Sequence, residues 1–223
     1  MFTVATWNVE RVKPRSWRRL PIVQEALAAR SHHVLVLTES HVDVRPRRGM
    51  SLVAQSTPAP DRTPGERWVC IWIDDSLRAS PLELFEEPER SAAALISIEG
   101  SVPLIVFGTV LPWRGDGRRE AKGAEAFVAS LEAQSADLRR LRAQHPEANL
   151  AVLGDLNQEV EGEGPVGTAA GRRAFHEFLA NHRLVALTGG AGDPLLRRGW
   201  RESIDHILID SAIASRAHPA MAW

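Results

Sequence analysis

The chain has 223 residues, of which 44% are hydrophobic and 25% are charged; this is the composition of a soluble globular domain and excludes a wholly disordered chain. No apolar run reaches the roughly 18 residues of a membrane-spanning helix, and the single cysteine, Cys70, argues against a disulfide framework or a thiolate zinc site. The formal net charge of -1 gives no overall basic field that would steer the chain to nucleic acid.

Seven segments predict β-strands, because each is a short run of aliphatic or aromatic residues bounded by polar or turn-forming residues. In chain order they are Val4–Val9, Val34–Thr38, Trp68–Ile73, Ala93–Ile98, Leu104–Leu111, Leu150–Leu153 and Ile204–Ile209. Several runs are apolar at every position, which indicates strands covered on both faces. Cys70 lies in the third run, so we expect it to be a buried structural thiol.

Helices are predicted at Arg18–Ala29, Glu120–Ala143 and Ala169–Asn181. In the longest, apolar side chains recur near every 3.6 residues, so this helix is expected to lie on a sheet. Residues 55–67 contain three prolines and a glycine, which predicts a surface loop between two strands. The elements together indicate one domain, residues 1–223, with the architecture of an α/β sandwich with outer helices.

Acidic and amide side chains stand where several predicted strands end. Asn8 and Glu10 follow the first strand, Glu39 follows the second, and Asp155 and Asn157 follow the sixth. Strand ends hold side chains in fixed geometry, and oxygen ligands without cysteine or paired histidine suit a hard cation such as Mg²⁺ better than zinc. Taken singly, each residue is also explained as a cap of a strand or turn.

Four segments occur in an order that resembles a known family. They are Thr6-Trp7-Asn8-Val9-Glu10, Leu37-Thr38-Glu39, Gly154-Asp155-Leu156-Asn157-Gln158 and Ser203-Ile204-Asp205-His206. On these motifs the chain resembles the endonuclease/exonuclease/phosphatase superfamily, which includes pancreatic deoxyribonuclease, abasic-site endonucleases, neutral sphingomyelinases and inositol phosphatases. The resemblance runs from Phe2 to about Asp210.

The resemblance implies a four-layer αββα sandwich of two mixed sheets with outer helices. It implies that Glu39 is the main carboxylate ligand of Mg²⁺ or Mn²⁺, with Asn8 and Glu10 beside it. Asp155 would orient or deprotonate the attacking water, and Asn157 would position that water or hold a phosphate oxygen. A carboxylate that accepts a proton from water, next to a metal that offsets charge on the phosphate, is coherent chemistry.

Asp205 and His206 allow two interpretations as catalytic residues. The pair is similar to the family's Ser-Asp-His motif, whose imidazole contacts the scissile phosphate. Because a strand pattern follows at residues 207–210, the segment is also similar to the family's penultimate motif, in which the aspartate contacts the catalytic histidine. On the second interpretation the final motif and its closing strand are absent, and we expect the domain to be C-terminally incomplete.

Val110 is a second departure from the family, whose members usually carry a histidine or tyrosine near this place. A valine cannot donate a proton or a hydrogen bond to a phosphate. We therefore expect either that another residue assists the leaving group or that its departure relies on metal and water.

Arginines cluster after several predicted strand ends, where the family's loops surround the substrate. Arginine suits bidentate phosphate contacts and tryptophan offers a stacking surface for bases, so Arg11, Trp113 and Arg114 are candidate substrate-binding residues. An arginine-rich solvated surface with core tryptophans is an equally weighted alternative. The clusters contain Arg11, Arg15, Arg18, Arg19, Arg45, Arg47, Arg48, Arg114, Arg118, Arg119, Arg197, Arg198 and Arg201.

The leading hypothesis is a Mg²⁺-dependent phosphoesterase that hydrolyses a phosphodiester, with DNA or RNA favoured over lipid or inositol phosphates. The alternative is a non-catalytic module that keeps the fold and binds phosphate ligands or nucleic acid. The N-terminal residues lack the pattern of a secretory signal, which predicts a cytoplasmic protein, and we expect a monomer.

Overall fold

The N-terminal part of the chain forms a four-stranded sheet. The computed structural model describes residues 2–60, 62–115, 124–162, 164 and 166–218. The strands of this sheet are β1 (Val4–Asn8), β2 (Val34–His41), β3 (Met50–Gln55) and β4 (Glu66–Asp74), in the order β1-β2-β4-β3. β1 and β2 run parallel, and the other pairs are antiparallel.

The remaining strands form a six-stranded sheet in the order β5-β6-β7-β8-β10-β9. Its only parallel pair within the described residues is β7 with β8, so both sheets are mixed. The strands are β5 (Arg78–Leu82), β6 (Ser91–Ser97), β7 (Leu104–Val110), β8 (Asn149–Asp155), β9 (Leu184–Ala186) and β10 (Asp205–Asp210).

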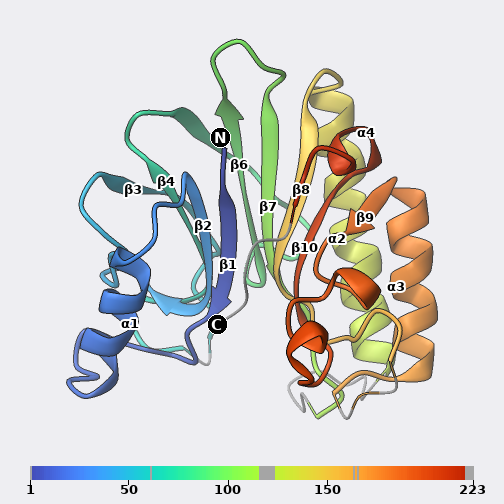
Figure 1. The fold of residues 1–223 in the computed structure, drawn as a ribbon, viewed down its shortest axis with the longest axis horizontal. Helices are drawn as coiled ribbons and strands as arrows, with labels where there is room; N and C mark the ends of the chain where they lie inside the picture. Colours follow the sequence, from blue (N-terminus) through green and yellow to red (C-terminus); the bar gives the residue numbers. More distant parts are fainter. Residues whose placement is uncertain (1, 61, 116–123, 163, 165, 219–223) are drawn as a thin grey trace.

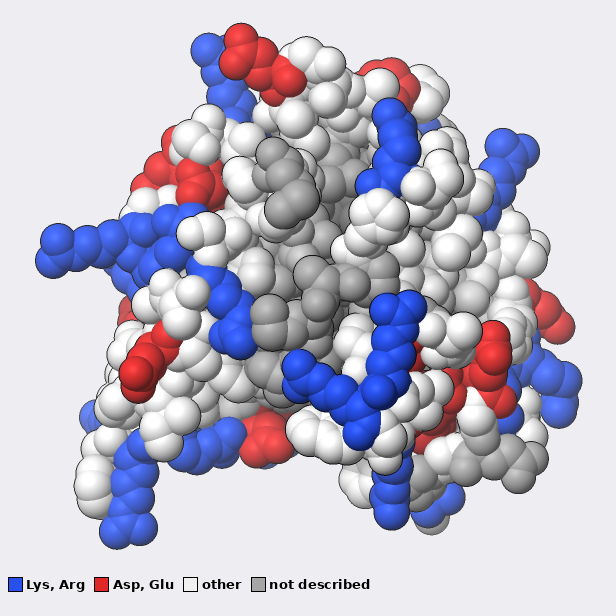
Figure 2. Space-filling model, viewed as in Figure 1, with Lys and Arg blue, Asp and Glu red and all other residues white. Residues whose placement is uncertain are grey.

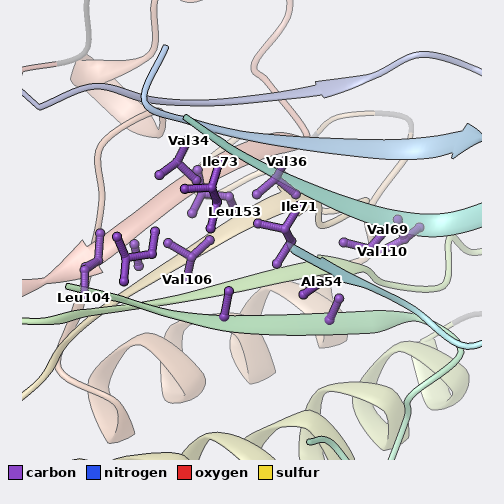
Figure 3. Close-up of a cluster of buried hydrophobic side chains, with 14 of the residues drawn as sticks. Val34, Val36, Ala54, Val69, Ile71, Ile73, Leu104, Val106, Val110 and Leu153 are labelled. Carbon is purple, nitrogen blue, oxygen red and sulfur yellow. The ribbon is translucent and has the colours of Figure 1, made fainter. Parts of the chain in front are cut away.

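The two sheets pack face to face, and helices lie outside them (Figure 1). A buried aliphatic cluster fills the space between the sheets, with Val36 and Ile71 from one sheet and Val106 and Leu153 from the other (Figure 3). Every side chain of β7 is buried, because this strand is covered by the other sheet on one face and by helix on the other. The predicted αββα sandwich is confirmed.

Helices α2 (Ala124–Gln144) and α3 (Ala169–Asn181) cover the outer face of the six-stranded sheet, and α1 (Arg19–Ala28) packs on the four-stranded sheet (Figure 1). α2 buries the predicted stripe, including Phe127, Leu131 and Leu138. The short α4 (Ser211–Ala214) follows β10. Among the described residues, no helix combines the length and the apolar character needed to cross a membrane.

The sequence pattern missed β3, β5 and β9 and misplaced several element ends. β5 is an edge strand that carries Pro81, a residue typical of loops, and β9 is only three residues long. Residues 120–123 of the second predicted helix lie outside the described residues. Cys70 is fully buried, and burial raises the pKa of its thiol to about 12, so the prediction of a structural thiol is confirmed.

Candidate active site

The polar ends of four strands meet at one end of the sandwich, the lower end in Figure 1. Asn8 ends β1, Glu39 lies within β2, Asp155 ends β8 and Asp205 begins β10. The first two belong to the four-stranded sheet and the last two to the six-stranded sheet. Residues that are up to 197 positions apart in the chain, from Asn8 to Asp205, therefore face one another across the gap between the sheets.

Asn8 joins the two sheets through its side-chain amide. Its Nδ2 donates to Asp155 Oδ2 at 2.9 Å and to Glu39 Oε1 at 3.3 Å. Its Oδ1 accepts the backbone N–H of Glu10 at 2.8 Å, which orients the amide. A neutral donor between two carboxylates reduces their repulsion and fixes both acids in place.

The backbone at this end is held in conformations that non-glycine residues rarely adopt. Glu39 has φ 48° and Asn157 has φ 51°. On either side of Glu39, Thr38 pairs with Val69 and Ser40 pairs with Arg67 of β4, without a shift of register. A non-glycine residue whose backbone is left-handed inside a strand costs about 1–3 kcal/mol. In Glu39 this conformation accompanies a carboxylate that contacts Asn8.

Gly154 permits the close approach of β8 and β7 beside Asp155. Its φ is 148°, and a Cβ atom at this position would lie 1.9 Å from the carbonyl oxygen of Thr109. Only glycine fits there. The Gly-Asp pair of the motif thus combines a backbone requirement with the acidic side chain that follows it.

Asp155 and Asp205 lie directly opposite each other in the antiparallel β8–β10 pair. The pKa of Asp155 is raised to about 6, chiefly by burial and less by the charge of Glu39, and the hydrogen bonds from Asn8 and Asn157 oppose the rise. Burial also raises the pKa of Asp205 well above its ordinary value, with further contributions from Asp155 and Glu39. Asp205 Oδ1 is buried and has no hydrogen-bond partner among the described residues.

His206 does not reach this cluster, which corrects its assignment as a catalytic residue. Side chains alternate along a strand, so His206 points to the face of β10 opposite to that of Asp205. It is fully buried beside Phe175, with Nε2 2.8 Å from the carbonyl oxygen of Gln158, and burial lowers the pKa of its imidazole. It is a core residue.

Glu10 also turns away from the cluster, contrary to its assignment as a metal ligand. Its φ is 49°, and its exposed carboxylate pairs with Arg19 at 3.1 Å. Asn157 does face the site: its backbone N–H donates to Asp155 Oδ1 at 3.1 Å, and its Nδ2 donates to the carbonyl oxygen of Leu111 at 2.9 Å.

A cavity of about 230 Å³ opens beside the acids. Of the predicted substrate-binding residues, Arg11 and Trp113 line it, and Arg11 Nε donates to Glu39 Oε2 at 3.1 Å. Arg114 is exposed and is not among the lining residues. The lining residues are Arg11, Glu39, Trp68, Arg90, Val110, Leu111, Trp113, Asp155 and Asn157.

The sequence pattern does not indicate the cavity residues Trp68, Arg90 and Leu111. Trp68 was assigned to the strand core, and Arg90 precedes β6 without any motif around it. The guanidinium carbons of Arg62 and Arg90 lie 3.5 Å and 4.7 Å from the centroid of the Trp68 ring. The only available signal was a basic residue directly before an apolar run. Arg118 and Arg119 of the predicted arginine clusters lie outside the described residues.

Carboxylate and amide oxygens are the ligand types that a hard divalent cation takes, so Glu39 and Asn8 are the candidate ligands. Asn8 turns its Nδ2 toward Glu39, while its Oδ1 accepts from the backbone of Glu10. In the described part of the chain, no group of three histidine, cysteine, aspartate or glutamate residues that could hold a metal occurs. Mg²⁺ typically takes one or two carboxylates and keeps several waters for substrate phosphate oxygens. Zinc would require more side-chain ligands.

Comparison with solved structures identifies proteins of the same fold. An abasic-site (AP) endonuclease from Archaeoglobus fulgidus has 18% identity and a TM-score of 0.64, over 96% of this chain and 89% of that one. A mannosyl-6-phosphatase from Bacteroides thetaiotaomicron has 14% identity and a TM-score of 0.66, over 95% and 86%. An endonuclease/exonuclease/phosphatase family protein of the same organism has 14% identity and a TM-score of 0.65, over 94% and 83%.

No protein-family model matches the sequence, and no curated protein matches it. The structural likeness therefore stands on the fold. The fold that the predicted resemblance implies is confirmed, and the similar structures include an endonuclease and a phosphatase.

Proposed function

We propose that the chain is a divalent-metal-dependent phosphoesterase that hydrolyses a phosphodiester. The observation that carries the proposal is the contact of Asn8 with Glu39 and Asp155 across the two sheets. This contact gathers one candidate metal ligand and one candidate base beside a cavity lined by Arg11 and Arg90. The fold, shared with an endonuclease and a phosphatase, supports the same reaction class.

In this mechanism the Glu39 carboxylate, with the Asn8 amide beside it, would hold the cation, Mg²⁺ or Mn²⁺. When bound, the cation offsets negative charge on the phosphate oxygens. Asp155 accepts the proton of the attacking water, because burial gives its carboxylate a pKa of about 6, close to a working pH. Asn157 fixes the Asp155 carboxylate through its backbone N–H, and Arg11 and Arg90 bind phosphate oxygens.

Nucleic acid is the substrate class that the surface favours. Trp17 is 73% exposed, Trp113 51% and Trp200 58%, and all three lie in loops outside the sheets. Exposed arginines stand in the same loops, and Figure 2 shows basic side chains along the lower part of the face, with acids among them. Aromatic and arginine side chains together suit nucleotides, which places DNA or RNA ahead of lipid or inositol phosphates in the proposal.

The test compares wild type, Glu39→Ala and the matched control Glu99→Ala, an exposed acid beyond β6. The substrates are supercoiled plasmid and bis(4-nitrophenyl) phosphate, each with Mg²⁺, Mn²⁺ or a chelator. The proposal predicts metal-dependent nicking and hydrolysis in wild type and the control, with both reactions lost in Glu39→Ala. Equal turnover in all three proteins contradicts the proposed site.

A non-catalytic phosphate-binding module is the second candidate, and it is favoured by Val110 in place of a proton donor and by Asp205 Oδ1, which has no histidine or other hydrogen-bond partner among the described residues. It predicts that the chain binds an oligonucleotide and hydrolyses nothing at any metal concentration. Metal-dependent turnover excludes it. The cytoplasmic location and the monomeric state stay predictions.

A further inference from the structure

Val110 stands between an acidic and a basic side chain in a row across the six-stranded sheet. It pairs with Asp155 in the β7–β8 ladder, and its backbone N–H donates to the carbonyl oxygen of Arg90 at 3.0 Å. Asp205 extends the row beyond Asp155. The row therefore runs from two acids, through one apolar residue, to an arginine. Neighbouring strands are about 4.8 Å apart, which sets the spacing between the residues of the row.

The basic end of the row is built around Trp68. Arg62 and Arg90 both place guanidinium groups within 4.7 Å of its ring centroid. Arg62 NH1 also lies 3.9 Å from Glu39 Oε2, and Arg90 lines the cavity. Desolvated guanidinium groups stabilise negative charge that develops nearby. The cavity therefore pairs a carboxylate end with an end that favours an anion.

The wall between these ends is apolar. Val110 belongs to the core cluster between the sheets (Figure 3), Leu111 is buried next to it, and the half-exposed ring of Trp113 closes the outer side. A Cβ atom on Gly115 would lie 2.3 Å from the Trp113 ring, so the ring rests on this glycine. Among the described lining residues, Val110 and Leu111 carry no donor or acceptor in their side chains, so this wall has no proton to offer a leaving oxygen.

The direction of the reaction follows from this row. Phosphoryl transfer places the attacking and leaving oxygens roughly in line. With the attacking water at Asp155, the leaving oxygen points along the row toward Val110 and Arg90. It meets a methyl surface and a guanidinium group there, and Val110 has no proton to give it.

We propose that this site selects phosphate esters whose leaving group departs as a stable anion, an aryl oxide or a phosphate, over esters of alkyl alcohols. The inference rests on the proposed function. The water oxygen forms a bond to phosphorus and gives its proton to Asp155, while the bond from phosphorus to the leaving oxygen breaks and that oxygen keeps the electron pair. Arg90 stabilises the resulting anion, and Trp113 contacts an aromatic leaving group.

The test measures kcat/KM of wild type for the 4-nitrophenyl, phenyl and benzyl esters of methyl phosphate and for a dinucleoside pyrophosphate. Phenol has a pKa of about 10, like a tyrosine hydroxyl. General acid catalysis contributes about 10²–10⁴-fold, so its absence predicts that kcat/KM falls at least about 10²-fold from the 4-nitrophenyl ester to the benzyl ester. Values within tenfold of each other across the esters overturn the inference.

Two variants provide further tests of the inference. Val110→His is expected to raise kcat/KM for the benzyl ester at least about tenfold relative to the 4-nitrophenyl ester, while Val102→His, an exposed control before β7, leaves the ratio unchanged. Trp113→Ala is expected to lower kcat/KM for the two aryl esters more than for the benzyl ester and the pyrophosphate, and an equal effect on all four substrates excludes contact of Trp113 with an aromatic leaving group. Because Val110 is buried, the wild-type series decides the question even where Val110→His does not fold.

The two proposals fail in different ways. Absence of turnover on every substrate overturns the proposed function and this inference with it. Metal-dependent turnover that is independent of the leaving group overturns the inference alone.

Discussion

Replacing Asp155 by asparagine should stabilise the protein at neutral pH while it abolishes activity. Burial raises the pKa of Asp155 from 3.8 to about 6 in the folded state. The unfolded chain therefore releases this proton at lower pH than the folded chain does, and the free energy of unfolding falls as the pH rises from 3.8 to about 6. The difference of about two pKa units corresponds to about 3 kcal/mol.

Asp155→Asn removes the ionised carboxylate from the buried site and keeps an oxygen that accepts the hydrogen bond from Asn8. The expected gain in the free energy of unfolding is at most about 3 kcal/mol at pH 7.5, and it vanishes near pH 4, where the native carboxyl is protonated. Urea unfolding at both pH values, in chelator so that no cation lowers the pKa, measures it. Asp75→Asn, an exposed acid, is the control.

A loss of stability in Asp155→Asn that is equal at both pH values would refute this reasoning. It would mean that ionising this carboxyl costs the folded chain no stability, so that its pKa is not raised by folding. A gain restricted to neutral pH would instead identify Asp155 as a group kept for its chemistry at a cost in stability.

Three further outcomes follow from the structure. The pKa of His182 is lowered from 6.5 to about 4, chiefly by burial and then by Arg142 and Arg139. The free energy of unfolding should therefore fall, by at most about 3 kcal/mol, as the pH falls from 6.5 to about 4. In urea unfolding at a series of pH values, His182→Gln should remove this fall, and the same dependence on pH as in wild type would contradict the role given to His182. Gly154→Ala should destabilise the chain by about 3 kcal/mol or more through its clash with Thr109, seen as a lower urea midpoint, and a midpoint equal to wild type would refute the close approach. Mg²⁺ should raise the melting temperature of wild type but not of Glu39→Ala, and equal shifts would exclude Glu39 as a ligand.

The sequence predicts the position of Asn8, Glu39 and Asp155 because each follows an apolar run, and strand ends in a sandwich gather at its edges. It could not decide between Asp205 and His206, which are adjacent in the chain. Only the pairing of Asp205 with Asp155 fixes which of the two side chains lies on the Asp155 face of the sheet, and the period of two then places His206 on the opposite face, in the core.

Trp68 and Arg90 are functional candidates that only the assembled sheets reveal. Trp68 belongs to an apolar run that is otherwise core, and Arg90 reaches the cavity because β6 pairs with β7. Glu10 is the opposite case, a residue that the sequence indicates as a ligand because it lies beside Asn8. Its left-handed backbone directs its carboxylate to Arg19 instead. Register and backbone conformation, which depend on contacts distant in sequence, decide all three cases.

The most direct test of the account is the rate of hydrolysis of bis(4-nitrophenyl) phosphate by wild type and Asp155→Asn at saturating Mg²⁺. We expect turnover in wild type that a chelator stops, and a loss of at least about 10²-fold in kcat in the variant, which is the typical contribution of a general base. Equal rates in the two proteins, both folded, would contradict the assignment of Asp155 as the base and with it the proposed site.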